Sequence, residues 1–128
     1  MFTKDSLLEK LNELSFPVTE YWLVAGAAMV LYGFRPETRD IDLGCSTLLA
    51  DQLQEQGCAV VYLEDGTRKI PYSEDVELFE NWIDGTVETV DGVPVVSVEG
   101  LIQMKRALGR EKDLADIALI QKISGETD

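Results

Sequence analysis

The chain lacks histidine altogether and carries only two cysteines in 128 residues. Without histidine it can form neither a Ser-His-Asp triad nor a His-ligated zinc site, so proton transfer would depend on carboxylates or lysine. Cys45 and Cys58 do not form a Cys-x-x-Cys motif, and the N-terminal residues show no signal-peptide pattern. These features predict reduced thiols in a cytoplasmic protein.

Basic residues are also scarce, with 11 Lys and Arg against 24 Asp and Glu and a formal net charge of −13. Such a surface repels polyanions, so extended nucleic-acid binding is not expected. Arg35 and Arg39 stand close to the acids Asp40 and Asp42, and four more basic residues fall within 105–112. This concentration is compatible with one anion pocket or with ordinary charge on helix surfaces.

Long apolar runs are missing as well. The longest, 21–34, is interrupted by glycine and is too short to span a bilayer, so no contact with a membrane is predicted. Apolar residues make up 45% of the chain, enough for one ordinary core, and the length predicts a single domain over 1–128.

Local patterns predict helices and strands that alternate along the chain. Asp-Gly pairs at 65–66 and 91–92 are hairpin signals, which argues against a purely parallel sheet. The predicted class is therefore α/β (α+β), a mixed β-sheet flanked by helices. The expected helices are 6–14, 27–32, one capped by Ser46 or Thr47 and reaching 56, 98–108 and 112–123; the expected strands are 21–24, 40–43, 59–63, 69–70, 75–79, 86–90 and 93–96.

Asp40 and Asp42 are the first candidate functional residues. On a strand, residues two apart point to the same side, so both carboxylates should project together while Ile41 and Leu43 face the core. Two adjacent carboxylates repel each other unless a cation lies between them. Mg²⁺, or Mn²⁺, is the natural candidate because such ions take hard oxygen ligands.

Gly26 and the helix behind it suggest a place for phosphate. Glycine at a turn from strand to helix permits close backbone approach, and the helix N-terminus at Ala27 offers free N–H groups. Gly26 is equally compatible with a plain helix start. Arg35, Thr38 and Arg39 could hold the carboxylates or a phosphate, or could simply be solvated in a loop.

Four segments together resemble the nucleotidyltransferase superfamily, and in particular small bacterial members related to the AbiEii-type toxins. They are LVAGAA at 23–28, GFRPETRDIDL at 33–43, LIQMK at 101–105 and REKDLADI at 110–117. The resemblance implies the nucleotidyltransferase fold with a C-terminal helical pair. It also implies transfer of an NMP group from a Mg²⁺-bound NTP to a hydroxyl of a protein, a tRNA or a small molecule.

The same resemblance implies roles for single residues. Asp40 and Asp42 would hold the metal, and a third acid on a later strand would complete the site. We assign that acid to Glu77, with Asp75 as the alternative. Lys105 would contact the triphosphate, although without the resemblance it reads as a surface lysine.

Other features give structural expectations or leave the function open. Lys112 and Asp116 form an i,i+4 pair, and Asp113 lies in the first turn of the last helix, where an acid is favoured. Trp22 and Trp82 are expected in the core or an interface.

Ala25 replaces the first glycine of the family's pair. The alternative function is therefore a catalytically degenerate binding module, such as a toxin–antitoxin component. An acceptor surface could also come from a partner protein or a second copy of the chain.

Overall fold

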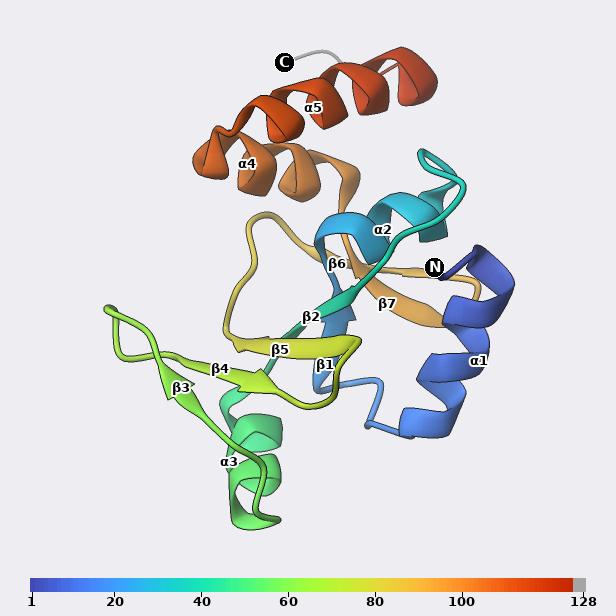
Figure 1. The fold of residues 1–128 in the computed structure, drawn as a ribbon. Coiled ribbons are helices and arrows are strands. Elements are labelled where there is room, and N and C mark those ends of the chain that lie inside the picture. Colours follow the sequence, from blue (N-terminus) through green and yellow to red (C-terminus); the bar gives the residue numbers. More distant parts are fainter. Residues whose placement is uncertain (126–128) are drawn as a thin grey trace.

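The computed structural model describes residues 1–125, in which helices surround a mixed sheet (Figure 1). In chain order the elements are α1 (Lys4–Leu14), β1 (Tyr21–Leu23), α2 (Ala25–Tyr32), β2 (Ile41–Cys45), α3 (Thr47–Glu55), β3 (Val61–Tyr62), β4 (Arg68–Pro71), β5 (Val76–Glu80), β6 (Val87–Val90), β7 (Val93–Val96), α4 (Val98–Leu108) and α5 (Glu111–Ser124).

The sheet has seven strands in the order β3-β4-β5-β2-β1-β7-β6. β2 is central, antiparallel to β1 on one side and parallel to β5 on the other. β1 is in turn parallel to β7, while β3–β4, β4–β5 and β6–β7 are antiparallel. The predicted mixed sheet is thus confirmed, and it places β2, which carries Asp42, beside β5.

The helices divide between the two ends of the sheet. Figure 1 shows the α4–α5 pair and α2 above the sheet, α3 at the opposite end and α1 beside it. α4 spans the residues predicted for it, and Gly109 follows it with a φ of 63°. Because glycine tolerates this left-handed conformation, it reverses the chain between the two C-terminal helices.

Both predicted hairpins are present. Asp91 and Gly92 have φ of 51° and 76°, as a two-residue turn that matches the twist of the flanking strands requires. The expected strand at 59–63 is shorter, because β3 pairs with β4 only over Val61–Tyr62. Both residues of β3 are exposed at the edge of the sheet. Burial in the core therefore does not stabilise a longer strand here.

The core forms as the alternation on β2 predicts, with Ile41 and Leu43 fully buried. Gly44, between β1 and β5, has no room for a side chain, since a Cβ there would overlap the indole of Trp22. That indole donates a hydrogen bond from Nε1 to the Trp82 carbonyl oxygen at 2.9 Å. Gly44 therefore lets Trp22 tie β1 to the segment that follows β5.

Within the described residues, no helix is both long and apolar enough to cross a membrane.

Candidate active site

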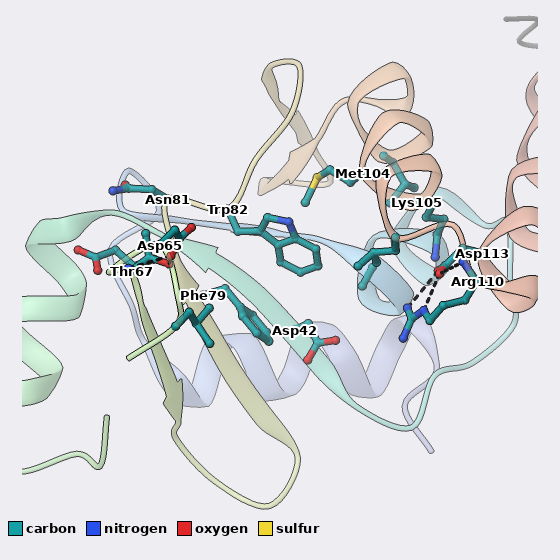
Figure 2. Close-up of a pocket in the computed structure, with 15 residues that line it drawn as sticks. Asp42, Asp65, Thr67, Phe79, Asn81, Trp82, Met104, Lys105, Arg110 and Asp113 are labelled. Atoms are coloured by element: carbon teal, nitrogen blue, oxygen red, sulfur yellow. Dashed lines mark hydrogen bonds and ion pairs between the residues drawn. The ribbon is translucent and has the colours of Figure 1, made fainter. Parts of the chain in front are cut away.

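A cavity of about 520 Å³ lies between the sheet with its connecting loops and the α4–α5 pair (Figure 2). Figure 2 shows Asp42, Lys105, Arg110 and Asp113 towards one end, and Asp65, Thr67 and Asn81 towards the other. Its walls are formed by Ala25, Asp42, Leu63, Asp65, Thr67, Phe79, Glu80, Asn81, Trp82, Leu101, Met104, Lys105, Leu108, Arg110 and Asp113.

Asp42 and Glu77 meet across two neighbouring parallel strands. In the register of β2 with β5, their Cα atoms are direct partners. Directly opposed residues point to the same face of a sheet, so the two carboxylates project on one side. The strand expected at 40–43 begins one residue later, at Ile41, so Asp40 immediately precedes β2.

The pKa of the Asp42 carboxyl is strongly shifted. Burial raises its pKa from 3.8 to about 6, and the negative charges of Glu77 and Asp40 add to the effect. Lys69 and Lys105 oppose the rise. Two of the acids predicted from the sequence thus lie close enough to Asp42 to disfavour its charge.

Asp42 is the member of the predicted acid trio that lines the cavity. Asp40 is exposed, and Glu77 is half-buried and pairs with Lys69 on β4, with 3.2 Å between Nζ and Oε2. Within residues 1–125, no three acid or cysteine side chains converge closely enough to form a ready metal-ligand group. The register thus brings the acids to one region of the sheet without gathering them around one point.

The N-terminus of α2 opens towards the cavity, which Ala25 lines. Val24 precedes the helix and makes no side-chain capping bond, so the first N–H groups have no side-chain cap. The helix begins two residues before the predicted start, which places Gly26 in its first turn ahead of Ala27. A Cβ on Gly26 would overlap the hydroxyl of Thr38, so the glycine lets the 35–38 loop pack against α2.

The three loop residues proposed for phosphate binding lie away from the cavity lining. Thr38 is buried and donates to the Asp40 carbonyl oxygen at 3.2 Å, which fixes the chain just before β2. Arg35 Nη2 lies 2.6 Å from Asp116 Oδ1 on α5. Arg39 is exposed.

Lys105 lines the cavity and is buried, so its interpretation as a surface lysine is wrong. Its Nζ donates to Asp116 Oδ2 at 3.0 Å. Asp116 therefore binds Lys105 and Arg35 together, whereas its predicted partner Lys112 is exposed. Leu108, on the same helix, also lines the cavity and is 45% exposed.

Arg110 and the aromatic wall were not predicted as site residues. Arg110 lines the cavity and forms a fork with the buried Asp113 at the start of α5 (Figure 2). Two sequence signals included it: the basic cluster at 105–112 and the segment 110–117, which it begins. Trp82, expected in the core or an interface, lines the cavity and packs edge-on against Phe79, with ring centroids 5.1 Å apart.

Comparison with known proteins gives structural relatives. No protein-family model and no curated protein sequence matches the chain. A solved structure of the lincosamide antibiotic adenylyltransferase LnuA with lincomycin bound is similar over 91% of this chain and 93% of that one, at 17% identity and a TM-score of 0.57. A structure of ANT(2")-Ia in complex with adenylyl-2"-tobramycin is similar over 91% of this chain and 84% of that one, at 19% identity and a TM-score of 0.55. The predicted nucleotidyltransferase fold is thereby confirmed.

Proposed function

We propose that the protein transfers an NMP group from an NTP to a hydroxyl of a small-molecule acceptor, with Mg²⁺ or Mn²⁺. One observation carries the proposal: Asp42 on β2 and Glu77 on β5 are direct partners in the strand register. Asp42 lines the cavity, as does Ala25 at the N-terminus of α2. Carboxylates beside a phosphate-binding helix end are the arrangement that this chemistry needs.

The chemistry of the residues fits a divalent cation. Asp40, Asp42 and Glu77 supply oxygen donors of the kind that Mg²⁺ prefers. The pKa of Asp42 is raised first by burial and then by the negative charges of Glu77 and Asp40, and a cation would relieve that repulsion. Asp40 and Asp42 would hold the ion. Glu77 would become the third ligand once its ion pair with Lys69 is broken. The bound ion would neutralise charge on the phosphates.

Protein groups would do the remaining work. The first N–H groups of α2, at Gly26 and Ala27, would receive phosphate oxygens, and Lys105 would contact them as a point charge. Glu77 would accept the proton of the acceptor hydroxyl. The hydroxyl oxygen would bond to the α-phosphorus as the bond to the bridging oxygen breaks, and pyrophosphate would leave.

The cavity favours a small acceptor over a macromolecule. Its volume of about 520 Å³ is typical of small-molecule sites. Phe79, Trp82 and Met104 give it an apolar wall, and Asp65 adds an acidic group. A net charge of −13 disfavours tRNA, and the two solved structures compared above contain an antibiotic or its adenylyl derivative.

The experiment is incubation with Mg²⁺ and each NTP labelled at the α-phosphate, in the presence of lincomycin, tobramycin, other hydroxylated compounds, tRNA or protein. Label is expected on a small molecule, with release of pyrophosphate. Asp42→Asn should lower the rate at least about 100-fold, the scale of a lost acid–base or metal-binding group. The matched control is Glu74→Gln, which changes an exposed acid in the loop before β5.

A second candidate is the degenerate binding module, including a toxin–antitoxin component of the AbiEii type. Two observations favour it: Ala25 has a φ of 53° where the family has glycine, and Lys69 already neutralises Glu77. A module of this kind would be stabilised by Mg²⁺-NTP against heat and would transfer no label. Label on any acceptor would contradict it.

A further inference from the structure

Two basic residues among those described in the structure line the cavity, Lys105 and Arg110. A triphosphate brings several negative charges, and Lys105 already shares Asp116 with Arg35. Arg35 and Arg39, the loop cations first considered for the phosphates, do not line the cavity. Arg110 is therefore the remaining cation placed to meet an anionic ligand there.

The guanidinium of Arg110 is held in a fixed orientation. Its Nε lies 2.6 Å from Asp113 Oδ2 and its Nη2 lies 3.1 Å from Asp113 Oδ1. Asp113 also accepts from the Arg110 backbone N–H at 3.2 Å, and its side chain is 1% exposed. The acid is thus anchored in the protein, and it anchors the arginine in turn.

This fork uses one edge of the guanidinium and leaves the other for a ligand. Arginine has five N–H donors, of which Asp113 takes one on Nε and one on Nη2. The Arg110 side chain remains 53% exposed. In Figure 2 it extends from the start of α5 towards the side of the cavity where Asp42 lies.

We infer that Arg110 is a nucleotide-binding residue that grips a phosphate of the NTP through its second edge, with Asp113 as its positioning residue. The inference rests on the proposed function, because it takes the cavity as the triphosphate site. A planar guanidinium matches two oxygens of one phosphate, whereas Lys105 offers a point charge. Because Asp113 fixes the side chain beforehand, binding costs less conformational entropy.

The test uses Mg²⁺-tripolyphosphate, an inorganic probe that needs neither a base nor an acceptor, and titration calorimetry at fixed salt. Arg110→Ala is expected to raise the dissociation constant about 10- to 100-fold, the scale of hydrogen bonds to a charged group. Arg110→Lys keeps the charge but loses the planar edge, so it should remain about 5-fold or more weaker than wild type. Lys112→Ala, which removes an exposed charge two residues away, should stay within about 2-fold.

Arg110→Ala leaves the buried Asp113 without its partner and could unfold the protein. The double variant Arg110→Ala/Asp113→Asn removes the unpaired charge and should show the same loss of affinity. Equal weakening by Arg110→Ala and Lys112→Ala would overturn the inference in favour of a diffuse charge effect, as would wild-type protein that does not bind the probe. A wild type that binds the probe through Arg110 but labels no acceptor would support the inference and contradict the proposed transfer.

Discussion

At the scale of single residues, Ala25 stands out because it combines strain with a place in the cavity lining. Its φ of 53° lies in the left-handed region, which costs an L residue roughly 1–2 kcal/mol. Glycine has no such cost but loses about 0.5–1 kcal/mol more conformational entropy on folding than alanine. The strain exceeds the entropy term, so glycine should be the more stable residue at this position.

We therefore predict that Ala25→Gly raises the free energy of unfolding by about 0.5–1 kcal/mol, measured by urea denaturation. The matched control is Ala28→Gly, a buried position in the same helix without a positive φ, where glycine should lower the free energy of unfolding by about 1 kcal/mol. Destabilisation by both substitutions to the same degree would show that Ala25 is not strained.

The raised pKa of Asp42 predicts a dependence of stability on pH. The folded-state pKa of about 6 lies above the ordinary 3.8, so between these values the native state binds more protons than the unfolded chain. The contribution of this group to the free energy of unfolding therefore falls as the pH rises from about 4 to 6, and it stays low above that. The full shift corresponds to about 3 kcal/mol, which partial solvent screening reduces to about 1–2 kcal/mol.

Asp42→Asn should accordingly raise the free energy of unfolding by about 1–2 kcal/mol at pH 7.5 and by almost nothing at pH 4. The measurement is urea denaturation at several pH values with a chelator present. Glu74→Gln, at an exposed position, serves as the control and should change the free energy by less than about 0.5 kcal/mol at every pH. A difference between Asp42→Asn and wild type that does not vary with pH would contradict the assignment.

At the scale of elements, Asp116 connects three separate parts of the chain. It accepts from Lys105 on α4 and from Arg35 in the loop before β2, and it lies on α5 itself. The Lys105 side chain is only 7% exposed, whereas that of Arg35 is 33% exposed. Loss of Asp116 would therefore leave the buried ammonium group of Lys105 without this partner, whereas water could still hydrate the guanidinium of Arg35.

We predict that Asp116→Ala lowers the free energy of unfolding by about 3 kcal/mol, because one partner of a buried ion pair is removed. Lys105→Met/Asp116→Ala should recover part of this loss, since no unpaired charge stays buried. Lys112→Ala, an exposed change on the same helix, should stay within about 0.5 kcal/mol. A loss from Asp116→Ala as small as that of Lys112→Ala would mean that the ion pairs do not hold α5 in place.

The elements were predictable from local signals, and the site only in part. Asp-Gly turns, the glycine after α4 and the alternation around Ile41 depend on nearby residues, and the structure confirms them. The partners of Asp116 and the place of Trp82 in the cavity depend on how distant elements pack. An i,i+4 spacing could only suggest Lys112, because the sequence does not say which helix face meets the loop.

At the scale of the whole molecule, the net charge of −13 means that any cation stabilises the protein to some extent, so specific cation binding has to be distinguished from this general effect. Like charges repel in the compact state, and raising the ionic strength from about 0.01 to 0.15 M shortens the Debye length from roughly 30 to 8 Å. Sodium chloride should therefore stabilise the protein to heat by screening alone. Stabilisation by magnesium chloride is informative only where it exceeds that effect.

We predict that magnesium chloride stabilises the protein to heat more than sodium chloride does at equal ionic strength. Mg²⁺ bound at Asp40 and Asp42 would add about 1.4 kcal/mol at roughly ten times its dissociation constant, on top of the screening effect. Asp40→Asn/Asp42→Asn should abolish this excess but keep the response to sodium chloride, because only two of the 24 acids change. Thermal denaturation of both proteins, with and without ATP, measures the two terms. An equal magnesium excess in the variant would identify diffuse counterion binding, and no excess in wild type even with ATP would remove the metal from the proposed site.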